Sequence, residues 1–250
     1  SELPKPEMPK LLDEESVKLD LWHWKDPLLQ PMQAKRNRPG RINCAWHFDA
    51  GRLTVLSKRD TDSVSMLTPD GSWALLQDSA PYAQRVSWDA TYADVYLVDT
   101  SSGGAKRVMS ALRGRASSSP NGRTLAAFRD GHWYVVDVAS GKERCLTKGM
   151  DVTFAREDWD TPQPARAYGI AGWSEDGAHV FIHDRFDLWS FPLDGGAPSC
   201  VTDGWGRQSK VALRYTSLDR EERFLPVGQP ILLAATNDET KATGYYTDTV

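Results

Sequence analysis

Three carboxylates lie close together in one long polar stretch, Met150 to Tyr168. Glu157, Asp158 and Asp160 fall within four residues of one another. A cationic group such as an ammonium suits them, because charge-assisted hydrogen bonds are shorter and stronger than neutral ones. Acids in a loop are usually solvated, yet long loops between regular elements often carry function. These three acids are therefore candidate ligand-binding residues.

A second group of side chains has the chemistry of metal ligands. His179 and His183 are four residues apart, which places both on one face of a strand, and Asp184 follows directly. Zinc sites use three or four convergent ligands, however. Ordinary strand residues, with Asp184 starting a turn, explain the pattern as well. We expect no metal and no cofactor.

A hydrolytic serine would need the spacing G-x-S-x-G at a strand-to-helix turn. The nearest string, Gly172-Trp173-Ser174-Glu175-Asp176-Gly177, has one residue too many. No alternation of strand and helix follows it. We therefore predict no catalytic residue in these 250 residues and no catalysis by this chain alone.

The elements that position these residues are predicted to be strands. The chain has 10 Trp, 8 Tyr and 7 Phe together with 19 Gly and 15 Pro, a composition that does not favour helix. Short β-branched and aromatic runs end at Gly, Asp, Asn or Pro, and few segments keep the apolar spacing of a helix. The predicted fold class is all-β.

Charge and hydropathy argue against some kinds of partner. The 30 Lys and Arg against 34 Asp and Glu give a net charge of −4, whereas proteins that bind nucleic acid normally carry a basic excess. The richest apolar run, Ile231 to Ala235, is far shorter than the ~20 residues of a membrane helix. Residues 1–17 lack the apolar core of a signal peptide. We expect no nucleic-acid partner and no membrane span, and the compartment stays open between the cytoplasm and the periplasm or exterior.

The strands repeat along the chain. Two anchors, Ser119–Gly122 and Ser174–Gly177, end in the Asn-Gly and Asp-Gly dipeptides that favour tight hairpins. Equivalent residues follow at identical offsets of 12, 19, 23 and 25: Tyr134, Gly141, Cys145 and Thr147 after the first glycine, and Trp189, Gly196, Cys200 and Thr202 after the second. We predict that Thr124–Phe128 and His179–His183 are equivalent strands. About five units of four antiparallel strands fit the chain, which predicts a β-propeller or part of a larger ring.

Longer strings carry a resemblance to a known family. The unit S-x-[DN]-G, strand, D-x-W/Y, D-x-x-G, x-L-T resembles the TolB-like blade of propellers in the prolyl oligopeptidase family of serine peptidases. Further strings are similar to the middle and late propeller of large bacterial members: LWHWKDP with LQPMQ at 21–33, YGIAGW at 168–173, DRFDLW at 184–189, and NDETK before GY at 237–245. The resemblance extends from about Leu19 to Tyr246.

That resemblance implies an organisation and a function. Residues 19–250 would form the propeller, and residues 1–18 an N-terminal extension. In that family the propeller precedes an α/β-hydrolase domain and narrows access to its Ser, Asp and His triad. The expected function is thus a non-catalytic propeller that gates and orients peptide substrates for a hydrolase domain outside this chain. The substrate-binding candidates remain Glu157, Asp158 and Asp160, in a loop expected to project from one rim.

A stand-alone TolB-like propeller that serves as a protein-binding scaffold is the alternative. Its blades would be the same, so ring closure distinguishes the two hypotheses. A free-standing propeller must join its first and last strands in one blade to hide their edges. The segments expected to share that blade are Asp20–Trp24 and Ile231–Ala235.

Overall fold

The structure is a computed structural model that describes residues 22–26, 28–35, 41–59, 62–219, 221–222 and 224–250. The chain divides into two compact units, residues 1–39 and 40–250. Within the described part of the first unit there is one short helix, α1 (Gln30–Lys35). The predicted extension, residues 1–18, lies outside the described residues, so its boundary stays a prediction.

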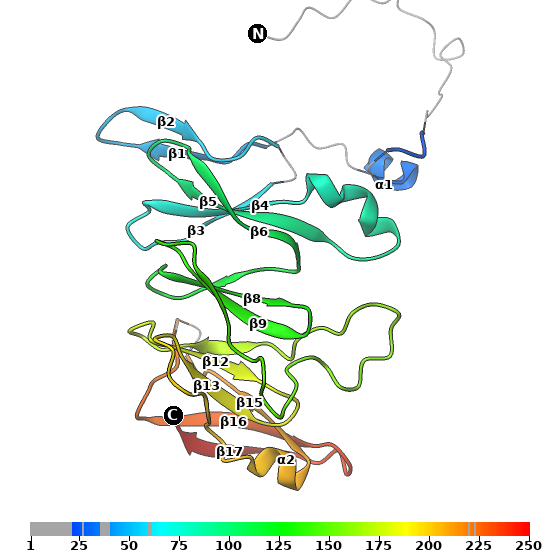
Figure 1. Ribbon diagram of the computed structural model, residues 1–250, viewed down its shortest axis with the longest axis vertical. Helices are drawn as coiled ribbons and strands as arrows, with labels where there is room; N and C mark the ends of the chain where they lie inside the picture. The colour runs from blue at the N-terminus through cyan, green and yellow to red at the C-terminus, as the bar shows by residue number, and fades with distance from the viewer. Residues whose placement is uncertain (1–21, 27, 36–40, 60–61, 220, 223) are drawn as a thin grey trace, which may run out of the picture. The chain divides into compact units, whose positions relative to one another are not determined.

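The second unit consists of antiparallel sheets that follow one another along the chain (Figure 1). A two-stranded sheet comes first, with β1 (Cys44–His47) and β2 (Arg52–Val55). Three four-stranded sheets follow: β3 (Ser63–Met66), β4 (Trp73–Asp78), β5 (Tyr92–Asp99) and β6 (Ala105–Arg113); β7 (Ser117–Ser118), β8 (Thr124–Arg129), β9 (His132–Asp137) and β10 (Glu143–Cys145); β11 (Ile170–Trp173), β12 (His179–His183), β13 (Leu188–Pro192) and β14 (Ser199–Cys200). The last sheet has three strands: β15 (Val211–Tyr215), β16 (Pro230–Asn237) and β17 (Thr243–Thr249). Two short helical segments connect strands: the 3₁₀ helix η1 (Ala80–Ser87) and α2 (Trp205–Ser209).

The predicted all-β fold built from four-stranded antiparallel blades is confirmed, except for the strand number of the first and last sheets. Three sheets have four strands, but within the described residues the first has two and the last has three. The predicted equivalence is also confirmed, because β8 and β12 are each the second strand of their sheet.

The tight turns explain why the repeat can be recognised in the amino-acid sequence. Gly122 and Gly177 both have φ of 68°, a conformation that glycine adopts without strain. In each turn a serine hydroxyl accepts the backbone N–H that opens the second strand, at 3.0 Å from Thr124 and 2.8 Å from His179. The S-x-[DN]-G pattern thus encodes a capped hairpin turn.

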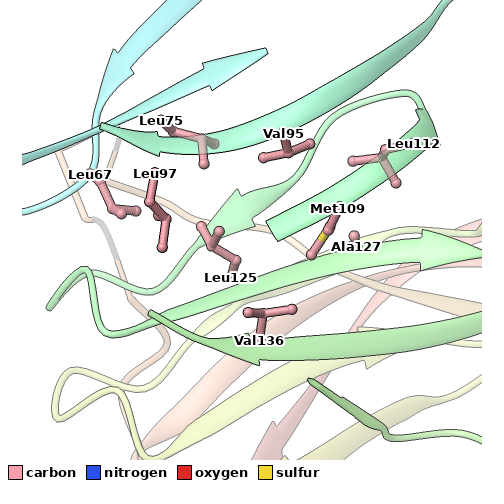
Figure 2. Close-up of a cluster of buried hydrophobic side chains, with 9 residues drawn as sticks. All are labelled: Leu67, Leu75, Val95, Leu97, Met109, Leu112, Leu125, Ala127 and Val136. Carbon is pink, nitrogen blue, oxygen red and sulfur yellow. The ribbon is translucent and has the colours of Figure 1, made fainter. Parts of the chain in front are cut away.

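Apolar side chains fill the spaces between successive sheets. The cluster between the β3–β6 and β7–β10 sheets is drawn in Figure 2, where Leu97 and Leu125 approach one another from the two sheets. A second cluster joins the β7–β10 and β11–β14 sheets around Val180 and Ile182, and a third joins β11–β14 to β15–β17. The three four-stranded sheets bury apolar side chains against their neighbours, as blades must.

Of the two segments expected to close a ring, the structure describes one fully and the other in part. The segment Ile231–Ala235 lies in β16, and both edges of β16 are already paired, with β15 and with β17. Of the other segment, Asp20 and Leu21 lie outside the described residues. Trp22 and Trp24 are exposed and outside any strand. The expectation that the two segments join in one closing blade stays a prediction.

Because the strands alternate in direction, the connections alternate between two ends of the sheets. The β8–β9 and β12–β13 turns, the segment from β10 to β11, η1 and α2 fall at one end, which we call the loop end. The capped turns at Gly122 and Gly177 fall at the opposite end. The three candidate acids belong to the loop end.

Candidate functional site

The 150–168 loop is folded onto itself. Phe154, at its start, is 1% exposed and belongs to the second core cluster. Ala155 and Ala167 form an antiparallel bridge, and the amide of Arg156 donates to the carbonyl of Arg166 at 2.8 Å. The loop is therefore an ordered projection at the loop end.

The tip of this loop reaches back to the preceding sheet. Nε2 of Gln163 donates to the backbone carbonyl of Asp89, which follows η1, at 2.6 Å. Nη2 of Arg113, at the end of β6, donates to Oε1 of Gln163 at 2.8 Å, and Nη1 of Arg113 donates to the carbonyl of Pro164. Inside the loop, Nε1 of Trp159 donates to the carbonyl of Gln163 at 2.7 Å. The loop therefore spans the junction between the β3–β6 and β7–β10 sheets.

A groove of about 710 Å³ opens where the loop crosses this junction. Its walls come from the η1–β5 connection, the end of β6, the β8–β9 turn and residues 163–167 of the loop. Tyr92, Phe128 and Pro164 supply apolar and aromatic surface. A hollow of this size is typical of small-ligand sites, which combine apolar walls with a few polar groups.

Arginines dominate the charge of the groove. Arg113, Arg115, Arg129 and Arg166 line it, against the carboxylates of Asp89 and Asp130. Arg129 is neutralised by Glu143, at 2.9 Å, and Asp130, at 3.6 Å. No ion pair involves Arg113, Arg115 or Arg166 within the described part of the chain. The groove therefore carries an excess of positive charge.

The three predicted acids are not equivalent. The carboxylate of Glu157 lies between two guanidinium groups, with Oε1 at 3.1 Å from Arg207 and Oε2 at 3.4 Å from Arg185. Asp158 and Asp160 are exposed and form no ion pair among the residues described. Substrate contact by these acids stays a prediction, and at Glu157 an ammonium would compete with two arginines.

The Asp184–Trp189 string forms the frame behind Glu157. Asp184, fully buried, accepts hydrogen bonds from the amides of Phe186 and Asp187 at 2.7 and 2.6 Å. Nη2 of Arg207 lies 3.3 Å from Oδ2 of Asp184. Because the same nitrogen reaches Glu157, the turn, α2 and the 150–168 loop are joined by one guanidinium.

The histidine pair has separate surroundings. The ring of His179 stacks on Phe181, with 6.4 Å between ring centroids. His183 is 6% exposed, and burial, followed by the positive charge of Arg214, lowers the pKa of His183 to about 3. Within the described ranges no three His, Cys, Asp or Glu side chains gather as metal ligands. The absence of a metal stays a prediction.

Ser174, the serine of the string closest to a nucleophile motif, has a structural role. Its side chain is buried in the β11–β12 turn, where Oγ donates to Oδ1 of Asp176 at 2.6 Å and accepts from the amide of His179. An activated serine needs a base within hydrogen-bond reach and open access to the attacked carbonyl. The carboxylate of Asp176 is within reach of Ser174, but the serine is 2% exposed, so a substrate carbonyl has no open access to it in this turn.

Sequence reasoning missed the groove arginines. Arg113 and Arg115 lie 37 and 35 residues before the start of the loop, outside the repeated positions, and no spacing connects them to it. The only available signal was local, two arginines around a glycine at the end of a strand.

Comparison with solved structures found distant resemblances to propeller proteins. A TolB-type protein from Agrobacterium tumefaciens is 15% identical, with 80% of this chain and 72% of that chain covered and a TM-score of 0.38. A puromycin-hydrolysing peptidase of Mycobacterium tuberculosis is 12% identical over 77% of this chain, with a TM-score of 0.38. The β-propeller domain of the Trilobed protease from Pyrococcus furiosus is 9% identical over 83% of this chain and 88% of that chain, with a TM-score of 0.29. The chain resembles TolB-type and peptidase propellers.

This propeller chain spans 33% of the mycobacterial peptidase's length. No family model and no curated protein matches its sequence. Among the described residues, no helix of the propeller has the length and apolar character needed to cross a membrane.

Proposed function

We propose that this chain is the non-catalytic propeller of a prolyl oligopeptidase-like serine peptidase, and that it gates and orients peptide substrates for an α/β-hydrolase domain outside the chain. The observation that carries the proposal is the groove at the loop end, closed on one side by the 150–168 loop. The resemblance of the blade unit and of the longer strings supports the same assignment.

The catalytic part of the proposal is tested with a fluorophosphonate probe. The 250-residue chain is expected to remain unlabelled, since Ser174 is buried in a turn. The complete protein is expected to be labelled at a serine outside these residues. Specific labelling of any serine within the chain, or none in the complete protein, would contradict the proposal.

The gating part is tested in the complete protein by shortening the loop tip. Removing 151–163 would also take Phe154 out of the core, so residues 158–162 are replaced by three glycines, which keeps the bridge between Ala155 and Ala167. We expect altered kcat/KM across peptides of increasing length. The control is a three-glycine replacement of 139–141, in the β9–β10 turn at the opposite end. Identical length profiles for both variants and the parent would refute gating by this loop.

A further inference from the structure

We propose that the arginine-lined groove binds the free C-terminal carboxylate of a peptide, with the last side chain against the apolar wall. This inference rests on the proposed peptide-orienting function and names the chemical class that the groove selects. It also differs from the expectation drawn from the acidic loop residues, which favoured a cationic group.

The first step is the state of the arginines. Arg113 has its guanidinium held by two neutral acceptors, Oε1 of Gln163 at 2.8 Å and the carbonyl of Pro164. Neutral acceptors orient a guanidinium without cancelling its charge. Arg166 has its guanidinium 5.6 Å from the ring centroid of Trp159, a contact that also preserves the charge.

The second step is the balance of charge around the groove. Arg115 and Arg166 are exposed and free of ion pairs among the described residues. Of the two lining carboxylates, Asp130 pairs with Arg129 at 3.6 Å. Asp89 lies beside Tyr92, where burial first and then this carboxylate raise the pKa of the Tyr92 hydroxyl. Arg113, Arg115 and Arg166 thus offer positive charge to an anionic ligand. Of the two lining carboxylates, only Asp89 would repel such a ligand.

The third step is the match of shape and chemistry. The planar guanidinium fork fits a carboxylate through two parallel hydrogen bonds. Phe128 and Pro164 provide apolar wall beside the arginines. The groove, of about 710 Å³, has room for the last few residues of a peptide.

The experiment compares three tetrapeptides on the purified 250-residue chain by isothermal titration calorimetry. The first is acetyl-alanyl-prolyl-alanyl-phenylalanine as the free acid, and the second is its C-terminal amide. The third is an amide with glutamate in place of the last residue, which moves the carboxylate to a side chain. We expect the free acid to bind at least about tenfold more tightly than either amide, the effect of one charge-assisted hydrogen bond. The ratio should shrink in high salt, because Arg115 and Arg166 are exposed.

Two single variants and a matched control complete the test. Arg115→Gln and Arg166→Gln should each bring the acid-to-amide ratio close to 1. Arg123→Gln should leave it unchanged, since Arg123 is exposed in the β7–β8 turn at the opposite end. Circular dichroism melts of each variant establish that it is folded.

The outcomes separate the two proposals. Equal binding of acid and amide, an unchanged ratio in both groove variants, or tight binding of the glutamate amide overturns the C-terminal carboxylate inference while peptide binding itself still stands. No binding of any peptide up to about 1 mM overturns both this inference and the peptide-orienting function.

Discussion

Nη2 of Arg207 lies 3.3 Å from Oδ2 of Asp184, a carboxylate with no exposed surface. The same nitrogen lies 3.1 Å from Oε1 of Glu157 in the 150–168 loop. One partly exposed arginine thus neutralises a buried acid of the β12–β13 turn and attaches the 150–168 loop to it. Stability and loop position depend on the same side chain.

Replacing Arg207 by methionine is therefore expected to destabilise the protein. Removing one partner of a buried pair costs about 3–5 kcal/mol. Asp184 keeps its amide donors and the Arg207 side chain is 37% exposed, so we expect a smaller loss, about 2 kcal/mol. Urea unfolding measures it, with Arg123→Met as the control. A loss equal to that of the control would mean that Asp184 is stabilised by its amide donors alone.

The close approach of neighbouring turns predicts different costs at two glycines. An added Cβ at Gly122 would lie 2.5 Å from the carbonyl oxygen of Leu67, whereas at Gly131 it would meet nothing within 4 Å. Both have positive φ, 68° and 81°. Gly131→Ala should cost only the left-handed strain, about 1–2 kcal/mol, and Gly122→Ala clearly more. Thermal unfolding of both variants measures the difference. Equal losses of stability would show that the turn at Gly122 can move away from Leu67 at little cost.

The buried His183 predicts a pH dependence of stability. Its pKa in the folded state is about 3, below the ordinary value of 6.5, because burial disfavours the charged ring. As the pH falls, the His183 imidazole is protonated in the unfolded chain before it is protonated in the folded protein. Its contribution to the free energy of unfolding is therefore fully present above pH 6.5 and is lost as the pH drops towards 3. The loss should be about 1.4 kcal/mol per pH unit within that window. His183→Gln should lack this component when unfolding free energies are measured from pH 7 to 4, and parallel curves for the two proteins would be inconsistent with a neutral buried imidazole.

The packing between sheets predicts a large penalty at Leu125. This side chain is fully buried in the cluster of Figure 2, and Leu125→Ala should cost about 2–5 kcal/mol through lost burial and the cavity left behind. Leu53, on β2, is 54% exposed and offers a matched control. A similar loss for Leu53→Ala would indicate that the first hairpin packs against more than the structure shows.

The sequence predicted those parts of the fold that depend on local turn chemistry. The two glycine anchors and their serine caps recur because each blade needs the same turn, and so β8 and β12 were placed correctly. Strand number at the two end sheets was not predictable in this way, since β1–β2 and β15–β17 lack that anchor. The partners of Ile231–Ala235, which are β15 and β17, could not be predicted because an apolar run does not specify its partner.

Only part of the candidate site could be predicted from the sequence, for a related reason. The long loop with Glu157, Asp158 and Asp160 stood out as an interruption of the repeat. Its contacts with Arg113, Arg185 and Arg207 come from three other elements, brought together only when the sheets stack. No spacing of residues along the sequence predicts these contacts.

The hydrogen bond from Gln163 to Asp89 has a mechanical consequence. It joins a loop that leaves one sheet to the backbone of the sheet before it, so the groove can widen only if the two sheets shear or this bond breaks. Sheet spacing and occupancy of the groove are then thermodynamically linked. If a ligand binds the narrower groove more tightly, its binding also stabilises the junction between the two sheets. The coupling free energy is the same in both directions, so a change that stabilises the junction strengthens ligand binding by the same amount.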